Sequence, residues 1–158
     1  MKKITSVVVL ALSLLSFKAI CQSKSEQDIK INIDLNSIKE DRVTVVVTPP
    51  KFTTNEVTYN FPKIIPGTYS EDDYGKMIVN LKAFDKNGKE IAVAKMDENS
   101  WKVTDAKKLA TITYQVDDTF DSEKGTGFGQ DDIFSPAGTN IDAGKNFMIN
   151  THGFVGYF

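Results

Sequence analysis

The chain has 158 residues, of which 41% are hydrophobic and 25% charged, and its formal net charge is −2. This is the composition of an ordinary globular protein, and the length favours a single domain. Basic residues do not cluster densely enough to indicate a nucleic acid or an anionic membrane as the partner.

The first 21 residues have the pattern of a secretory signal peptide. A basic start at residues 1–3 is followed by an apolar run at 4–17 and a small-x-small box that ends at Cys21. The apolar run is shorter than the roughly 20 residues that a membrane-spanning helix needs. We therefore expect cleavage after Cys21, export to the periplasm or the outside, and a mature domain, 22–158, without membrane contact.

Lipid attachment at Cys21 is the alternative. A lipoprotein box wants an aliphatic residue three positions before the cysteine and a small residue just before it, where this chain has Lys18 and Ile20. Cleavage after Cys21 removes the only cysteine and leaves 16 basic and 21 acidic residues. The mature domain would then lack disulfides and depend on its hydrophobic core.

Alternation of apolar and polar residues predicts strands along most of the mature chain. We expect a turn at 36–40, a hairpin turn at Asn87-Gly88 and a helical turn within 69–75. Turn signals at such short intervals predict an all-β fold, an antiparallel β-sandwich of about seven to nine strands with little or no helix after the signal peptide. The expected strands are 28–35, 42–48, 56–61, 77–84, 89–94, 101–103 and 110–116.

A rigid loop is predicted at residues 61–69. Pro62 and Pro66 exclude a helix interior or a central strand, and Pro66-Gly67 suits a type II turn. Apolar residues surround this turn, so we expect the loop to pack against something. They are Phe61, Ile64, Ile65 and Tyr69.

Two later segments differ from this pattern. Residues 121–132 are rich in glycine and acid and predict a long loop, and residues 146–158 form an apolar tail that ends on Tyr157-Phe158. Exposed aromatic residues at a chain end favour aggregation. We therefore expect either that the last strand tucks into the sandwich or that the natural chain continues past Phe158 and the domain is truncated here.

Candidate chemical groups are weak when taken one by one. His152 is the only histidine, so a two-histidine zinc site cannot form within these residues, and neither Ser70 nor Ser122 has a histidine beside it. The acidic residues of 117–132 could hold calcium, but the alternating-aspartate pattern is missing and a solvated loop is the better interpretation.

Two further candidate groups are also weak. The carboxylates at 71–73 are adjacent in sequence and do not converge on one point without a second element. Trp101 and Tyr114 could stack on a sugar but on alternating strands are more often core or rim residues. The residues alone therefore predict a β-sandwich without a self-contained active site.

A set of motifs in 60–116 adds a resemblance. The motifs are Phe61-Pro62, Pro66-Gly67-Thr68-Tyr69, Lys82-Ala83-Phe84-Asp85, Asn87-Gly88-Lys89-Glu90, Ser100-Trp101-Lys102-Val103 and Tyr114-Gln115-Val116. In their order and spacing they resemble the N-terminal domain of metallopeptidase family sixty-one, the glycyl aminopeptidase family. One difference is that Ile64-Ile65 stands where the family commonly has a tryptophan before the Pro-Gly turn. A branched aliphatic side chain fills less volume than an indole.

The resemblance implies a non-catalytic domain of an exported zinc-dependent aminopeptidase. The family's His-Glu-x-x-His motif is absent from this sequence, so no catalytic or metal-binding residue can be assigned, the chain alone should be inactive, and zinc is expected in a catalytic domain of the same parent chain. The N-terminal domain would pack on that catalytic domain and help to wall the cleft that receives the peptide substrate. Candidate docking residues are Ile64, Ile65, Pro66, Gly67 and Tyr69, and candidate cleft-facing acids are Asp121, Asp131 and Asp132. The alternative from another class is a stand-alone secreted β-sandwich that serves as a binding or scaffold module.

Overall fold

The computed structural model describes residues 28–66, 71–118 and 139–158. These residues form ten strands, two short 3-10 helices and one four-residue α-helix, so the prediction of an all-β fold with little helix is confirmed. The predicted signal peptide, 1–21, and the acidic loop, 121–132, lie outside the described residues. Within the part described, no helix is long and apolar enough to cross a membrane.

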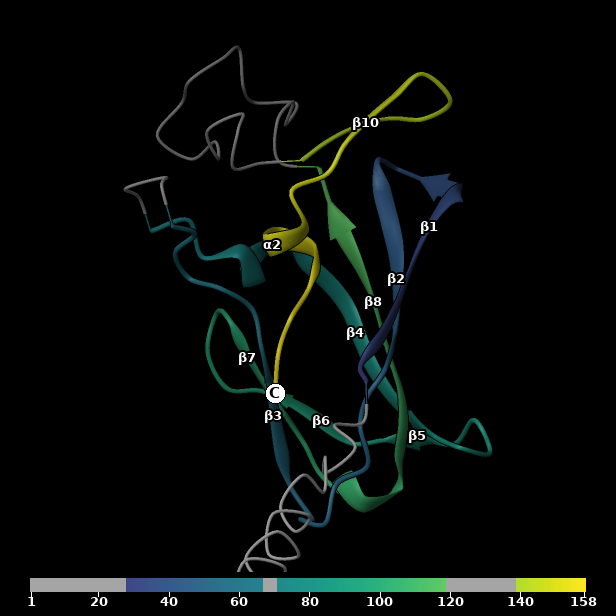
Figure 1. Ribbon diagram of the computed structural model, residues 1–158, viewed down its shortest axis with the longest axis vertical. Helices are drawn as coiled ribbons and strands as arrows, with labels where there is room; N and C mark the ends of the chain where they lie inside the picture. Colours follow the sequence, from purple (N-terminus) through teal and green to yellow (C-terminus); the bar gives the residue numbers. More distant parts are fainter. Residues whose placement is uncertain (1–27, 67–70, 119–138) are drawn as a thin grey trace, which may run out of the picture.

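Two main sheets face one another as the layers of a sandwich (Figure 1). The larger sheet has the order β1-β2-β8-β4-β5 and the smaller one β3-β7-β6, while β9 and β10 pair separately. All pairings between these strands are antiparallel. The strands are β1 (Lys30–Lys39), β2 (Arg42–Thr48), β3 (Val57–Asn60), β4 (Ile78–Asp85), β5 (Glu90–Ile91), β6 (Val93–Lys95), β7 (Ser100–Val103), β8 (Leu109–Asp117), β9 (Asn140–Asp142) and β10 (Asn146–Met148). The helices are η2 (Tyr74–Met77), η3 (Ala106–Lys108) and α2 (Thr151–Phe154).

The core lies between the sheets and is built from the apolar positions of the alternating strands. Valines of β2 and the inward residues of β8 are almost fully buried, and they pack with aromatic side chains from β3, β7 and α2. Complete burial of one large apolar side chain stabilises a fold by about 1.5–3 kcal/mol. The largest contributors are Val43, Val45, Val47, Tyr59, Phe61, Trp101, Ile112, Tyr114, Val116 and Phe154.

The turn predicted at 36–40 is misplaced, because β1 continues through it to Lys39. The chain reverses at Glu40 and Asp41, both of which have positive φ angles, 53° and 52°. The polar residues before them make an irregularity in the β1–β2 register instead of a reversal, and the Asp34 carboxylate accepts the amide hydrogen of Asn36 at 2.9 Å. The turn-forming side chains that the sequence shows at this point therefore form a bulge within β1 and not the reversal of the chain.

The strand predicted at 89–94 divides into two strands that belong to different sheets. β5 pairs with β4 in the larger sheet, and β6 pairs with β7 in the smaller one. The backbone therefore crosses from one layer to the other near Ala92. A change of sheet leaves the side-chain alternation nearly continuous, so the sequence pattern gave no sign of it.

The C-terminal tail packs along the opening between the two sheets. Phe154 of α2 is fully buried and Phe158 packs against the core, whereas the side chain of Tyr157 is 54% exposed. Tyr157 forms an antiparallel bridge with Asn60, the last residue of β3. Figure 1 shows this last segment, in yellow, descending from α2 to the end of β3. The tail is therefore tucked in at Phe154 and partly at Phe158, but not fully, because Tyr157 stays exposed.

Candidate functional site

The proline loop leaves the end of β3 and returns to form η2. The Lys63 carbonyl accepts hydrogen bonds from the amides of Asp72 and Asp73, at 3.0 and 3.1 Å, and the Pro62 carbonyl accepts one from the Tyr74 amide at 3.1 Å. An ion pair between Lys63 and Glu71, at 2.8 Å, joins the outgoing and returning segments of the loop. The expected reversal of the chain is present, although Gly67 of the predicted turn lies outside the described residues.

The predicted docking residues have different environments. Ile65 is buried against Tyr74 and Met77 within the domain, so its side chain contributes little to the surface. Ile64 is 50% exposed, and Pro66 is also exposed. Gly67 and Tyr69 lie outside the described residues. Ile64 and Pro66 are therefore the exposed ones among the predicted docking residues that the structure describes.

The predicted cleft-facing acids, Asp121, Asp131 and Asp132, all lie outside the described residues. Two neighbouring acids from the calcium hypothesis are described. Asp117 pairs with Arg42, and the Asp118 carboxylate accepts the amide hydrogen of Ile141 at 2.6 Å. Both carboxylates therefore already serve as partners within the fold.

A polar clamp fixes the base of the loop. The side chain of Asn99 accepts the Gly75 amide hydrogen at 2.9 Å and donates to the Asp73 carboxylate at 2.7 Å. The backbone carbonyl of Asn99 accepts a hydrogen bond from the Phe61 amide at 2.8 Å. A Cβ atom at Gly75 would lie 2.2 Å from the Glu98 carbonyl oxygen. Glycine is thus required there by close approach of the β6–β7 turn. Sequence reasoning missed Asn99, because the partners of its side chain, Asp73 and Gly75, lie more than 20 residues away in the chain.

An open polar pocket of about 420 Å³ lies beside this clamp. Its lining combines Lys63 with acidic residues from two separate loops. Each carboxylate has a partner in the fold: Asp73 binds Asn99, Asp97 accepts the Asn99 amide hydrogen and Glu98 pairs with Lys95. The described lining of the pocket provides no activated nucleophile. Its lining residues are Asn60, Phe61, Lys63, Asp73, Asp97, Glu98, Asn99, Ser100 and Tyr157.

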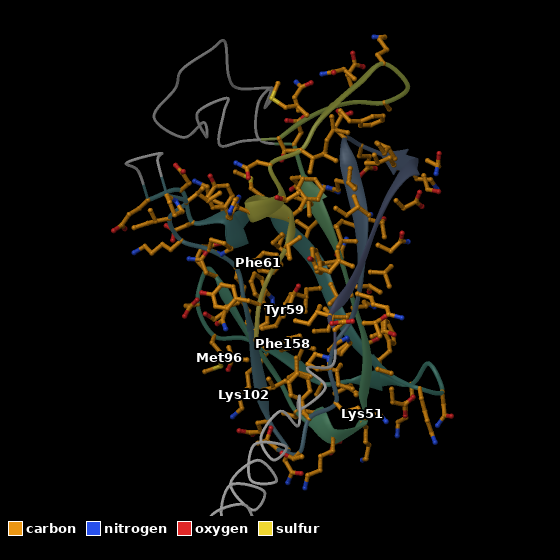
Figure 2. All side chains as sticks on the ribbon, viewed as in Figure 1. Lys51, Tyr59, Phe61, Met96, Lys102 and Phe158 are labelled. Atoms are coloured by element: carbon orange, nitrogen blue, oxygen red, sulfur yellow. The ribbon has the colours of Figure 1, made fainter. Side chains whose placement is uncertain are left out.

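A second open pocket, of about 580 Å³, lies at the other end of the sandwich and is rich in lysine. The lysines come from the segment after β2, the β4–β5 turn and η3, so they are separated in sequence and meet only in the fold. One of them, Lys51, is labelled near the lower end of the molecule in Figure 2. The pocket is lined by Thr48, Pro49, Lys51, Asp85, Lys86, Asn87, Lys107, Lys108, Leu109 and Ala110.

Aromatic residues hold the centre of the sandwich together. The ring of Phe61 makes edge contacts with those of Tyr59, Trp101 and Tyr114, with centroids 5.2–5.5 Å apart. Figure 2 shows Phe61, Tyr59 and Phe158 between the two sheets. Trp101 is 6% exposed and Tyr114 is 1% exposed, so their interpretation as core residues is confirmed. Neither aromatic ring is open for stacking on a sugar.

The hydroxyls of two buried tyrosines bind the C-terminal segment. Tyr114 donates to the Phe154 carbonyl at 2.6 Å, and the Tyr59 hydroxyl accepts the Gly156 amide hydrogen at 3.1 Å. The two hydroxyls lie 3.3 Å apart. Burial raises the pKa of both phenols above the ordinary value, because a phenolate would be poorly solvated there. Burial, and then the Asp72 charge, also raises the pKa of Tyr74 beside the loop.

The described residues include no group of three or more His, Cys, Asp or Glu side chains that could hold a metal ion. His152 is an exposed residue of α2, and its Nδ1 atom lies 3.2 Å from the Asn150 side-chain oxygen. These residues do not fit a zinc site, so no chemical step through zinc can be derived from them.

Comparison with known families decides the relationship. Residues 30–158 match the model of a family described as the peptidase M61 N-terminal domain. The chain belongs to this family. The motif residues that carried the resemblance in the sequence occupy structural positions of this M61 N-terminal domain: Phe61, Trp101, Val103 and Tyr114 are buried in its core. These four motif residues thus serve in packing, and the motifs assign no catalytic residue.

One solved structure gives a partial match to the M61 N-terminal domain. It is an aminopeptidase N family protein from Idiomarina loihiensis, with a TM-score of 0.52 and 26% sequence identity. The match covers 58% of this chain and 15% of that protein, so our chain corresponds to a small part of its length. No curated protein matches this chain.

Proposed function

We propose that this M61 N-terminal domain is the non-catalytic front part of an exported zinc-dependent aminopeptidase of the glycyl aminopeptidase type. The observation that carries the proposal is the family match over 30–158, supported by the partial match to an aminopeptidase N family protein. The domain packs on a catalytic domain of the same parent chain and helps to shape the cleft for the peptide. Zinc and the catalytic residues belong to that second domain.

The exposed part of the proline loop is our candidate for the docking face. Ile64 presents half of its side chain to solvent, although the loop that carries it is fixed by three backbone hydrogen bonds and the Asn99 clamp. A loop that is already rigid loses little conformational entropy when it binds. An apolar side chain on such a loop gains free energy when a partner removes it from water. Pro66, Gly67 and Tyr69 complete this docking face in the proposal.

The acidic loop would contribute charge to the cleft. An aminopeptidase must recognise the protonated α-amine of its peptide, and carboxylates supply the complementary charge. Asp121, Asp131 and Asp132 are our candidates for this role. They act on the substrate through the assembled enzyme, since a carboxylate without the catalytic domain performs no hydrolysis.

The first experiment is to read the coding sequence beyond the codon for Phe158 and to express the whole parent chain after signal cleavage. The proposal predicts a downstream His-Glu-x-x-His motif, hydrolysis of amino-terminal glycyl peptides, and loss of this hydrolysis after zinc is chelated. A stop codon directly after Phe158 would contradict it and favour the stand-alone binding or scaffold module.

The docking face is tested in the same parent chain with a matched pair of variants. Ile64→Glu places a charge on the proposed face, whereas Leu35→Glu places one on an exposed apolar residue of β1, far from the loop in sequence; Leu35 is 37% exposed. We expect Ile64→Glu to lower kcat/KM or the cooperativity of unfolding between the two domains, and Leu35→Glu to leave both unchanged. Equal effects of the two variants would contradict this docking face.

A further inference from the structure

The outer edge of β3 is already half occupied by the C-terminal segment. Asn60 and Tyr157 exchange two backbone hydrogen bonds: the Asn60 amide donates to the Tyr157 carbonyl at 2.7 Å, and the Tyr157 amide donates to the Asn60 carbonyl at 2.8 Å. Such a pair defines an antiparallel register completely. The segment around Tyr157 therefore behaves as the first part of a fourth strand beside β3 in the smaller sheet.

The hydrogen bonds on the other side of β3 determine which groups face this edge. The Phe61 amide donates to the Asn99 carbonyl, and the β3–β7 register pairs Tyr59 with Trp101. Because bonded and non-bonded pairs alternate in an antiparallel ladder, the backbone groups of Tyr59 and Phe61 point to β7, while those of Thr58 and Asn60 point to the outer edge. Asn60 is bonded there to Tyr157. Among the described residues, the Thr58 carbonyl is reached by the Asn60 side-chain amide, at a long 3.5 Å.

Side-chain positions agree with the same register. Phe158 falls opposite Tyr59, a non-bonded pair whose side chains should be close, and their ring centroids are 4.8 Å apart. Phe158 also contacts Phe52 at 4.9 Å and faces the core, whereas Tyr157 is 54% exposed and faces outward. Gly156 lies so close to β3 that a Cβ atom there would be 2.6 Å from the Asn60 carbonyl oxygen. The segment thus has both the register and the alternation of a strand.

We propose that the outer edge of β3 is the docking site for the polypeptide that follows Phe158, and that the first residue after Phe158 forms a bonded pair with Thr58. The occupant is this chain's own continuation, so the inference rests on the proposed function. By alternation, the side chain of that residue lies on the exposed face, beside the exposed side chain of Thr58.

The pairing also has an expected end. The next bonded position along the edge is Glu56, but the Thr54 hydroxyl donates to the Glu56 carbonyl at 2.9 Å. This hydroxyl competes for the acceptor that a longer strand would use, and Glu56 precedes the first residue of β3. We therefore expect the continuation to leave β3 after the Thr58 pair, so that the connection to the second domain starts at the Val57 end of the strand, opposite to the end that carries the proline loop.

Disulfide cross-linking in the whole parent chain tests this register. Thr58→Cys is combined with a cysteine at the first residue after Phe158, in a Cys21→Ser background. Bonded antiparallel neighbours have Cα atoms about 5.5 Å apart, a separation that a disulfide can bridge. The matched control carries Thr53→Cys, an exposed threonine of the preceding loop, with the same second cysteine. We expect an intrachain disulfide in the Thr58 variant to form at least about tenfold faster than in the Thr53 variant.

The outcomes separate this inference from the proposed function, because aminopeptidase activity is measured on the same parent chain without the cysteines. Activity together with equal cross-linking of both variants overturns the register alone. A fast Thr58 disulfide without activity supports the register and contradicts the proposed function. A disulfide that links two molecules and depends on protein concentration identifies a second copy as the occupant and overturns the inference, as does a stop codon directly after Phe158.

Discussion

The two segments that meet at the Asn60 end of β3, the C-terminal segment and the proline loop, are held by different kinds of interaction. The C-terminal segment is attached to a dry aromatic core through two tyrosine hydroxyls. Beyond Asn60, the proline loop is held mainly by backbone hydrogen bonds and the side chain of Asn99, with a small apolar cluster of Ile65, Tyr74 and Met77 beneath it. The difference teaches that the family motif serves both regions: its Phe61 belongs to the core and its Pro66 belongs to the surface.

The comparison is tested most strongly at Phe61 and Ile64, which are three residues apart in the same segment. Phe61 is 1% exposed and contacts three aromatic rings, whereas Ile64 is 50% exposed. We expect Phe61→Ala to lower the free energy of unfolding by about 3–5 kcal/mol, because it leaves a large cavity. Ile64→Ala should change it by less than about 0.5 kcal/mol. Urea denaturation of both variants checks this, and a similar loss in both would show that the loop is packed throughout.

The proline loop is tested next at Gly75, which contacts the β6–β7 turn. A Cβ atom there would overlap the Glu98 carbonyl and the Asn99 Cα atom, both of them backbone atoms. We expect Gly75→Ala to destabilise the domain by about 1–3 kcal/mol, the usual cost of overpacking, and to displace the Asn99 clamp. Lys76→Ala, at the next residue and on an exposed side chain, is the control. Normal stability of Gly75→Ala would mean that the β6–β7 turn can move away freely.

The attachment of the C-terminal segment is tested at Tyr114, whose hydroxyl can be removed without changing the ring. Tyr114→Phe leaves the buried Phe154 carbonyl without its 2.6 Å donor, and we expect a loss of about 1–3 kcal/mol. Tyr59→Phe removes the acceptor for the Gly156 amide and should have a similar effect. Since the two hydroxyls lie 3.3 Å apart, a double-mutant cycle should show coupling between them. Strictly additive losses would contradict a shared attachment of the C-terminal segment.

The smallest expected effect is a dependence of stability on alkaline pH. Burial raises the pKa of Tyr59 and Tyr114 in the folded state, and in the unfolded chain each phenol titrates near pH 10. The unfolded state therefore loses its proton first, so the stability is fully present below about pH 10 and falls as the pH rises above it. Thermal unfolding between pH 8 and pH 11 measures this slope. The slope should be smaller in the Tyr59→Phe, Tyr114→Phe double variant and unchanged in Tyr157→Phe, which alters an exposed side chain. An equal slope in the unaltered protein and both variants would contradict this prediction.

Several features of the fold could be predicted because they depend on neighbouring residues. Alternation in 42–48 and 110–116 located β2 and β8, and the two prolines of the loop excluded a strand or helix there. The docking candidates Ile64 and Ile65 could not be distinguished in the same way. Both are apolar and adjacent, and only the return of the chain at Asp72–Tyr74, which provides Tyr74 as a packing partner, buries one and exposes the other.

By itself, the sequence determined the β class, most strand positions and the family, because side-chain period and turn residues act over a few positions and the core motifs keep their order. The tertiary structure alone decided which sheet each strand joins, that Asn99 clamps Gly75, and that Tyr59 and Tyr114 hold the C-terminal segment. These contacts join residues up to 97 positions apart. Their partners are selected by the packing of the whole sandwich, which leaves no local pattern along the chain.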